Sequence, residues 1–373
     1  MNNDCDLLYI TFVDLNNLDC SGSSLRPLKM LHAFESLGLN IKVLDGWNNQ
    51  RKVRNKNVKE ILYWLKTNKP KTCYVEPPSG PIFCAIDLKL LRTLKKMGVP
   101  IGLFYRDAYW KFPSFDCGEK KPLAERIKLQ IVKAMQMIDW RVFKKVCSHI
   151  FFPSNTMADL FDVDNKSALP PACVLRDGID NKTEQERIKT AQYLTYFYVG
   201  GASTRYGTPL LIESFKKVNS EKVVSKLILV CPNNQWENIK NIVDTTNCDS
   251  WLTVVHASGD DTLKPLYAQS DIAVIPLLRS VYNDFAVPIK MYEYVSFDKP
   301  IVATNCTEMK SFICKNQVGY VVEDNIESLS NKIIELNENR GTVIKVKNQC
   351  AKVAKENTWE SRAQRVIEVL NKD

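Results

Sequence analysis

The stretch NDFAVPIKMYEYVSFDKPIVAT, residues 283–304, combines residue types that could hold a phosphorylated ligand. Pro288 predicts the start of a helix over 289–297, because the N–H that proline lacks would be unpaired there anyway. The free amides of the first turn, including that of Ile289, can face a diphosphate, and Lys290 lies close by. Glu293 follows on the same helix face. A solvated Lys–Glu ion pair, worth a few tenths of a kcal/mol, is the plainer interpretation.

A second candidate loop is GGASTRYG, residues 200–207, which follows a predicted strand and precedes a helical run. Gly201 lets the backbone approach a ligand, the helix N-terminus favours an anion, and Arg205 offers a forked pair of donors to phosphate. The loop is neither G-x-G-x-x-G nor a Walker sequence, so it lacks the fingerprint of a dinucleotide or P-loop site. A turn with a surface arginine is the alternative.

These loops need sheets to position them, and the chain contains two sets of alternating strands and helices. Strands are predicted at 6–14, 40–46, 71–80, 99–107, 149–154, 193–201, 226–232, 251–257, 271–278 and 299–305. Helical periodicity predicts helices at 25–38, near 58–67 and near 84–98, and a basic stretch follows at 120–146. A polar, turn-rich stretch at 165–192 separates the two sets. The pattern predicts an α/β protein with two doubly wound parallel sheets, whose ligands bind beyond the carboxyl ends of the strands.

Length and composition limit the class of protein. The 373 residues suit two domains of about 150 to 200 residues each. The longest apolar runs are far shorter than the roughly 20 residues of a membrane span, and the N-terminus does not resemble a secretory signal. Twelve cysteines without C-x-x-C spacing and only three histidines indicate a reduced, cytosolic protein without a zinc site. The net charge of +9 favours anionic partners, such as nucleotide phosphates or anionic lipid.

The stretches VPIKMYEYVSFDKPIVAT, YAQSDIAVIPL and YFYVGGASTRYGTPLLIESF resemble the nucleotide-binding domain of retaining glycosyltransferases of the GT-B fold, especially family 4, also called group 1. The similarity covers about the last half of the chain, including TWESRAQRVIEVL, and the first half only in element order. It implies two Rossmann-like domains facing each other across a cleft. The acceptor-side domain would span 1–172 and the nucleotide-sugar domain 190–358, with a helix at 359–373 packing back on the first.

The resemblance also implies roles for residues of the second half. Glu293 matches the glutamate that holds the ribose of the donor, and Arg205 matches a basic residue on the donor diphosphate. Pro288 and Lys290 lie in a variant of the motif that resembles many bacterial members. Glu308, in ATNCTEMKSF, resembles the acidic residue after the next strand.

In the first half, the resemblance points to two sites. Gly22 and Ser23 resemble a flexible loop that closes on the donor. Asp107, in YRDAYW, falls where the family often has a His-Asp pair, with Arg106 in place of the histidine. Asp107, Arg205 and Lys290 are therefore the expected catalytic residues, although an Arg106–Asp107 salt bridge of purely structural value is the alternative for Asp107.

Two departures from the family pattern affect the donor site. The family often has a second glutamate eight residues before Glu293, where this chain has Phe285 with Asp284 beside it. A second basic residue is expected shortly after Arg205, but Tyr206 and Gly207 follow. Either the donor sugar is held differently or transfer activity is weakened.

The sequence therefore predicts a glycosyltransferase that uses a UDP- or GDP-linked sugar, without a metal or other cofactor, and a glycan, lipid-linked or protein acceptor. Bacterial surface glycan or glycoprotein assembly is the expected setting. The basic stretch at 120–146 mixes Lys and Arg with apolar residues, so it could rest on an anionic membrane or be a core helix with a solvated face. The alternatives are a non-catalytic GT-B-like subunit that binds glycan or a partner protein, and a nucleotide-sugar epimerase. Nucleic-acid binding is not expected, since no base-reading module is present.

Overall fold

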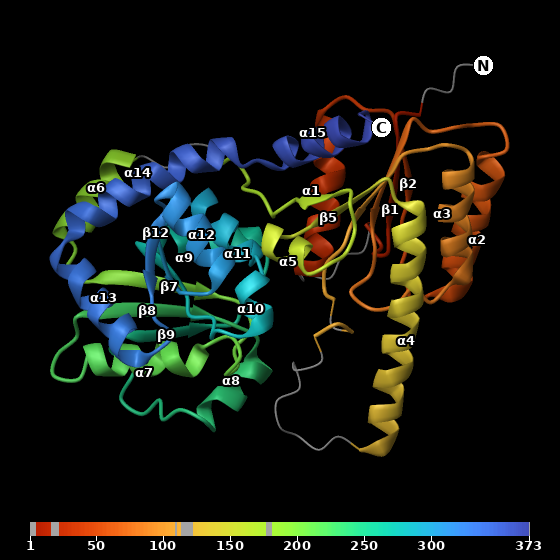
Figure 1. Ribbon diagram of the computed structural model, residues 1–373. Coiled ribbons are helices and arrows are strands. Elements are labelled where there is room, and N and C mark those ends of the chain that lie inside the picture. The colour runs from red at the N-terminus through yellow and green to blue at the C-terminus, as the bar shows by residue number, and fades with distance from the viewer. Residues whose placement is uncertain (1–4, 16–21, 109, 113–121, 177–180, 373) are drawn as a thin grey trace. The chain divides into compact units, whose positions relative to one another are not determined.

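The computed structural model describes residues 5–15, 22–108, 110–112, 122–176 and 181–372. The chain forms two compact units. The first unit comprises Met1–Pro170 and Trp359–Asp373, and the second comprises Pro171–Thr358. Each contains a parallel sheet of six strands with helices packed on it (Figure 1), so the predicted fold class, two doubly wound α/β sheets, is confirmed. None of the helices in the described part of the chain combines the length and hydropathy that a membrane span requires.

The sheet of the first unit has the strand order β2-β1-β3-β4-β5-β6, with every pair parallel. Its strands are β1 (Leu7–Thr11), β2 (Ile41–Leu44), β3 (Thr72–Glu76), β4 (Ile101–Phe104), β5 (His149–Phe152) and β6 (Lys166–Ala168). The central strands β1, β3 and β4 are buried along their whole length, as expected where helices cover both faces of a parallel sheet.

Helices of the first unit cover both faces of this sheet (Figure 1). They are α1 (Gly22–Ser36), α2 (Arg51–Trp64), α3 (Ala85–Lys96), α4 (Leu123–Val146), α5 (Asn155–Asp159) and α15 (Trp359–Leu370). On one face, α1 packs against α15, and Phe34 of α1 contacts the rings of Tyr9 and Tyr74. On the other, α2, α3 and α4 lie side by side.

Helix α1 corrects one expectation. Gly22 and Ser23, predicted to lie in a flexible loop, have helical backbone in the first turn of α1. The physical reason is that the amides of a first turn have no intrahelical partner, so glycine and serine are tolerated there. Residues 16–21 of the predicted loop lie outside the described residues.

The sheet of the second unit has the order β12-β11-β10-β7-β8-β9, again with every pair parallel. Its strands are β7 (Leu194–Val199), β8 (Ser225–Val230), β9 (Leu252–Val255), β10 (Ile272–Ile275), β11 (Ile301–Thr304) and β12 (Gly319–Val322). The short edge strands β6 and β12 were not predicted. All ten predicted strands are present, shorter than expected because polar residues at their ends belong to loops.

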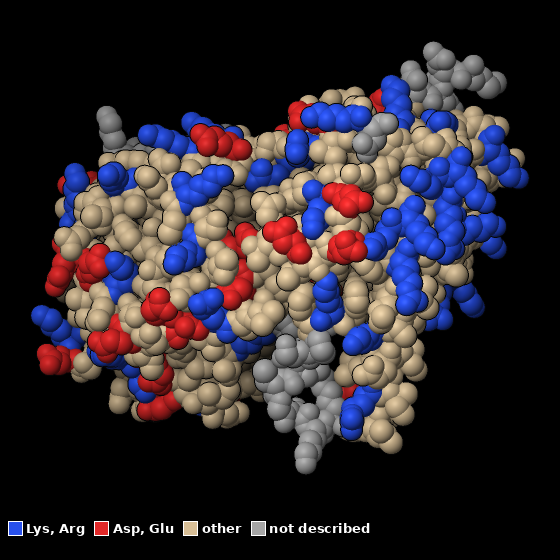
Figure 2. Space-filling model, viewed as in Figure 1, with Lys and Arg blue, Asp and Glu red and all other residues tan. Residues whose placement is uncertain are grey.

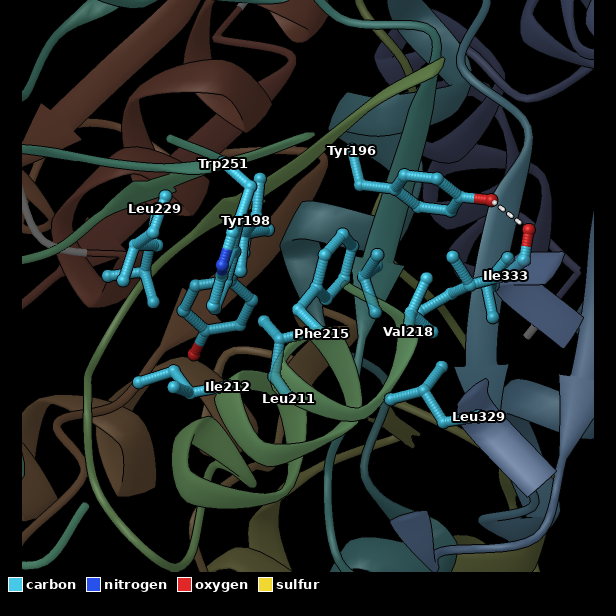
Figure 3. Packing of buried hydrophobic residues seen from close by; sticks show 14 of the residues in the cluster. Tyr196, Tyr198, Leu211, Ile212, Phe215, Val218, Leu229, Trp251, Leu329 and Ile333 are labelled. Atoms are coloured by element: carbon cyan, nitrogen blue, oxygen red, sulfur yellow. Dashed lines mark hydrogen bonds between the residues drawn. The ribbon is translucent and has the colours of Figure 1, made fainter. Parts of the chain in front are cut away.

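The helices of the second unit form two layers. They are α6 (Asn181–Thr190), α7 (Thr208–Val218), α8 (Asn233–Lys240), α9 (Asp260–Gln269), α10 (Val281–Phe285), α11 (Ile289–Ser296), α12 (Thr307–Asn316), α13 (Ile326–Glu338) and α14 (Arg340–Glu356). Buried residues of α7, α8 and α13 fill one core, in which Phe215 stacks on Trp251 and Tyr196 donates a hydrogen bond to the Ile333 carbonyl (Figure 3). Residues of α9, α11, α12 and α14 fill the core of the opposite face.

Candidate functional site

Both candidate stretches of the second unit lie at the point where the strand order of its sheet changes direction. The order places β7 beside β10, and the chain proceeds outward from them in opposite directions. Ligands of open α/β sheets bind outside the carboxyl ends of the strands at such a switch point. The loop 200–207 follows β7, and the segment 276–288 follows β10. The fold thus brings the two stretches to one place.

The loop after β7 is packed directly against the segment after β10. Gly207 has a φ of +72°, and a β-carbon there would lie 1.6 Å from the carbonyl oxygen of Pro276. Only glycine fits a left-handed position this close to another backbone. The amide of Ala202 donates a 2.7 Å hydrogen bond to the Gln235 side chain, which fixes the start of the loop. The backbone of the loop 200–207 is therefore held in place at both of its ends.

Lys290 lies against Gly200, the first glycine of this loop. Its Nζ is 3.4 Å from the hydroxyl oxygen of Tyr198 and 4.4 Å from the centroid of that ring. A β-carbon on Gly200 would lie 2.7 Å from this Nζ. Burial lowers the pKa of Lys290 to about 8, and the Glu293 carboxylate opposes the shift. Sequence spacing predicted Lys290 at the site, but not its contact with Tyr198.

Tyr206 lies between the two cationic side chains of the site. Its ring centroid is 5.7 Å from Lys290 Nζ and 5.6 Å from the guanidinium carbon of Arg205. A β-carbon on Gly201 would lie 2.6 Å from the same ring. Arg205 itself is exposed, with its guanidinium 5.5 Å from the ring of Tyr282. Two positive charges and Gly201 therefore lie around one aromatic ring.

Helix α11 supplies the remaining predicted residues of the second unit. Pro288 is its N-cap, and Ile289 and Lys290 form the start of its first turn. Glu293 is half-buried one turn later. Burial raises the pKa of Tyr267 well above its ordinary value, and the Glu293 carboxylate adds to this rise. Glu308 is half-buried in the first turn of α12, after β11.

Phe285 stands at the position where the resemblance leads one to expect a second glutamate, and Asp284 is its neighbour. Phe285 is buried at the end of α10. Asp284 accepts two hydrogen bonds from Arg279, at 3.1 and 3.0 Å, and one of 3.2 Å from the Thr307 amide. Partial burial raises the pKa of Asp284, but these donors outweigh it and the pKa is lowered. Asp284 is therefore an ionised carboxylate that ties α10 to the start of α12.

Asp107, Gly22 and Ser23 belong to the first unit. Asp107 follows β4 with a φ of +55°, a left-handed conformation that asparagine and aspartate adopt more readily than other non-glycine residues. Its Oδ2 accepts a 2.6 Å hydrogen bond from Ser79 and lies 3.4 Å from Arg106 Nε. The salt bridge with Arg106, expected as the structural alternative, is present. Ser79 was not anticipated, although it lies at the end of a predicted strand, as Asp107 does.

Comparison with known proteins identifies the second unit. Residues 194–339 match the family model described as Glycosyl transferases group 1. This part of the second unit is similar to group 1 glycosyl transferases. The matched stretch contains the loop 200–207, α11 and Glu308, which are the elements around the switch point. A search of curated proteins finds no match.

Solved structures of similar fold cover the whole chain. Sucrose-phosphate synthase from Thermosynechococcus elongatus has a TM-score of 0.70 at 10% identity, over 98% of each chain. WaaG, a glycosyltransferase involved in lipopolysaccharide biosynthesis, has a TM-score of 0.66 at 14% identity, over 98% of this chain and 99% of its own. Anabaena HepE, solved in complex with UDP, has a TM-score of 0.62 at 11% identity, over 99% of this chain and 100% of its own. The family match and this fold confirm the resemblance to GT-B glycosyltransferases of group 1.

Proposed function

We propose that this protein transfers a sugar from a nucleoside diphosphate sugar to a glycan, lipid-linked or protein acceptor, with retention of anomeric configuration and without a metal ion. The observation that carries the proposal is the placement of Lys290 against Gly200 at the start of α11, with Lys290 and Arg205 both near the ring of Tyr206. This arrangement offers two cations and free helix amides to one anionic group, as a diphosphate requires.

The proposed mechanism assigns a role to each residue of the site. Glu293 would accept hydrogen bonds from the two ribose hydroxyls. Arg205, Lys290 and the first amides of α11 and α7 would stabilise the negative charge that develops on the departing diphosphate, and most of the rate enhancement would come from this electrostatic effect. Gly201 would let the backbone approach the phosphates. Asp107 would contact the acceptor or the reacting sugar, and Glu308 would contact the donor from α12.

A UDP- or GDP-linked sugar is the proposed donor. HepE was solved with UDP, and trehalose-6-phosphate from E. coli is described as bound with UDP-2-fluoro glucose, which supports UDP as the first nucleotide to test. WaaG acts in lipopolysaccharide biosynthesis, which supports bacterial surface glycan assembly as the setting.

Nucleotide titration tests the donor site. We expect isothermal titration calorimetry to detect binding of one of UDP, GDP, CMP or dTDP, weakened about tenfold or more in Lys290→Met and in Glu293→Ala, since a lost charged contact is worth about 1.4 kcal/mol or more. Lys332 and Glu335 on α13 have the same i,i+3 spacing and form a surface ion pair, so Lys332→Met and Glu335→Ala are matched controls. Absence of binding by all four nucleotides would contradict the proposal.

A non-catalytic GT-B-like subunit is the second candidate. It is favoured by one observation: Phe285 occupies the place of the usual second glutamate, and the neighbouring Asp284 is held by Arg279 and Thr307. Slow hydrolysis of the matching nucleotide sugar, lost in Lys290→Met, would support the enzyme. Nucleotide binding without any hydrolysis or transfer would favour the subunit.

We also propose that the first unit rests on an anionic membrane surface, on the cytoplasmic side. Exposed Lys and Arg side chains gather over α2, α3 and the upper part of α4 (Figure 2). Helix α4 adds an apolar stripe on a side away from its buried residues, since Leu123, Ile127, Ile131 and Ile138 recur at helical spacing and are all exposed. A basic surface with an exposed apolar stripe suits anionic headgroups over an acyl layer.

Vesicle co-sedimentation tests this surface. The protein should sediment with phosphatidylglycerol vesicles and not with phosphatidylcholine vesicles, and the double variant Ile127→Ser/Ile131→Ser should stay in the supernatant. Ile242→Ser removes an exposed isoleucine of the second unit and should change nothing. Equal sedimentation of the double variant and the wild type would contradict the membrane proposal without affecting the donor site.

A further inference from the structure

Two buried polar side chains of α4 hold the loop that follows β3. Gln136 and Asp139 are 8% and 6% exposed and lie one helical turn apart. Gln136 Nε2 donates a 3.1 Å hydrogen bond to the Ser79 carbonyl, and Asp139 Oδ2 accepts a 2.8 Å bond from the Ile82 amide. The loop sequence PPSGPIFC contains three prolines, which limit its backbone freedom. Attachment at two points therefore fixes much of its course.

The loop passes this restraint on to Asp107. The Ser79 hydroxyl donates a 2.6 Å hydrogen bond to Asp107 Oδ2, while the carbonyl of the same serine accepts the bond from Gln136. Asp107 has a left-handed φ of +55°, which costs conformational energy and persists only where the surroundings hold it. The loop thus connects α4 with the residue that the proposed function places against the acceptor or the reacting sugar.

The contact between Asp139 and the loop leaves little room for water. A cavity of about 10 Å³ lies among residues that include Ser79, Ile82, Arg106, Gln136 and Asp139, and this volume is at the lower limit for one water molecule. Burial raises the pKa of Asp139 to about 6, although the Ile82 amide opposes the shift. The carboxylate is therefore held in a place that disfavours its charge.

The titratable and charged neighbours of Asp139 are neutral or paired at neutral pH. They are Tyr105 and Arg106 after β4, Cys84 in the loop, and Asp87 on α3, which packs against α4. Burial raises the pKa of Tyr105 and that of Cys84, so both stay uncharged. Arg106 lies 3.4 Å from Asp107, and Asp87 lies 2.7 Å from an arginine of α2. The other charged side chains of α3 are exposed.

We propose that Gln136 and Asp139 are positioning residues that clamp the loop 77–84 on α4 and, through Ser79, hold Asp107 in place, and that proton uptake tightens this clamp. The inference deepens the proposed function and rests on the role that it gives to Asp107. Asp107 would touch the acceptor or the reacting sugar, and the other three residues would act through it.

The direction of the pH effect follows from the burial of Asp139. In the open clamp the carboxyl group returns to water and to its ordinary pKa of 3.8, whereas in the closed clamp the pKa is about 6. Closing the clamp therefore takes up a proton at pH values between these two. The ratio of closed to open forms should rise about tenfold as the pH falls from 7.5 to 5.

Amide hydrogen exchange, followed by NMR on the full chain, tests the clamp. The protection factor of the Ile82 amide should rise about tenfold from pH 7.5 to pH 5 in the wild type. In Asp139→Asn the side chain still accepts the bond but does not titrate, so this pH dependence should be absent. The Asn40 amide is the matched control, because it donates to the carboxylate of Asp6, whose pKa Lys71 lowers. Its protection should stay constant over this range.

Two further variants separate the parts of the clamp. Gln136→Leu removes a buried hydrogen bond, so the protection of Ile82 should fall about fivefold or more at both pH values. Gln130→Leu changes an exposed glutamine of the same helix and should have no effect. The amide resonance of Asp107 should shift with a midpoint near pH 6 in the wild type. In Ser79→Ala this shift should be lost, while Ile82 keeps its pH dependence.

The outcomes are distinct. Protection of Ile82 that is constant from pH 7.5 to pH 5, or that changes equally in Asp139→Asn, overturns the clamp. A shift of the Asp107 resonance that persists in Ser79→Ala overturns the link to Asp107. Nucleotide binding is measured on the same samples. Absence of binding by all four nucleotides would contradict the proposed function and leave the clamp itself standing, because every clamp residue belongs to the first unit.

Discussion

At the scale of residues, the charge of Lys290 couples nucleotide binding to pH. Its pKa of about 8 in the folded protein lies below the ordinary value of 10.5, because burial disfavours the ammonium. The buried charge therefore destabilises the fold in full below pH 8, and this cost is relieved as pH rises from 8 to 10.5. A bound diphosphate acts in the opposite direction, since it favours the protonated lysine.

The affinity for the nucleotide should therefore fall as pH rises above 8, by up to about tenfold per pH unit. In Lys290→Met the overall affinity should be lower and this pH dependence absent. Titration calorimetry at pH 6.5 to 9.5 measures both. A wild-type affinity that stays constant to pH 9.5 would show that Lys290 does not contact the diphosphate.

Gly207 gives a second prediction at this scale. Gly207→Ala forces a β-carbon to 1.6 Å from the Pro276 carbonyl oxygen in addition to the left-handed strain, so we expect a loss of about 3 kcal/mol or more in unfolding free energy. Gly38→Ala, at a φ of +74° with nothing within 4 Å, should cost only the strain, about 1 kcal/mol. Urea denaturation compares the two variants, and equal losses would mean that the loop after β7 relaxes away from Pro276.

At the scale of elements, a buried ionic cluster holds α6 and α14 to the sheet of the second unit. Lys299, just before β11, lies 3.4 Å from Glu184 of α6, and Lys347 of α14 pairs with the same carboxylate. Both lysine side chains are almost fully buried. Burial raises the pKa of Glu184, but the two ammonium groups outweigh this effect and the pKa is lowered.

Glu184→Gln should destabilise the second unit by about 3 to 5 kcal/mol, because it removes the carboxylate that two buried ammonium groups share and leaves Lys347 only the longer 4.0 Å contact with Asp298. In the wild type, Glu184 contributes its full stabilisation of the fold at pH values above the pKa that it has in the unfolded chain. This stabilisation is lost as pH falls through the lowered pKa that Glu184 has in the folded protein. Chemical denaturation at pH 7 and in acid measures both effects. The exposed Glu186→Gln on the same helix should change stability by less than about 1 kcal/mol.

Sequence patterns predicted ten of the twelve strands in the described part of the chain and missed β6 and β12. The edge strands β6 and β12 each pair on one side only, and β6 has only the residues KSA, so neither presents a long apolar run. The motif residues around α11 could be found because they are close in sequence and follow strands. Glu184, Lys299 and Lys347 could not, since only the tertiary fold brings them together. The same is true of Arg26 and Glu76, which form a buried ion pair.

At the scale of the whole molecule, the first unit is completed by the last helix of the chain. The chain passes from the first unit to the second after Pro170 and returns at Trp359. Helix α15 packs against α1 and contacts β3 and β4. The buried side chains of α15 are Trp359, Ala363, Val366 and Leu370. A β-carbon on Gly102 of β4 would lie 3.1 Å from the Leu370 methyl, so this contact is close-packed.

Removal of residues 359–373 should therefore unfold the first unit and leave the second folded. Each large apolar side chain that loses its burial is worth about 1.5 to 3 kcal/mol, and the truncation also exposes the face of α1. Hydrogen exchange should show loss of protection in β1, β3 and β4 with protection of β7, β8 and β10 retained. Leu370→Ala should lower the unfolding free energy of the first unit by about 2 to 5 kcal/mol. It should therefore reduce the hydrogen-exchange protection of the same strands without unfolding them. Uniform loss of protection in both units would mean that they fold as one cooperative body, and unchanged protection of β1 and β3 would mean that α15 is dispensable to the first sheet.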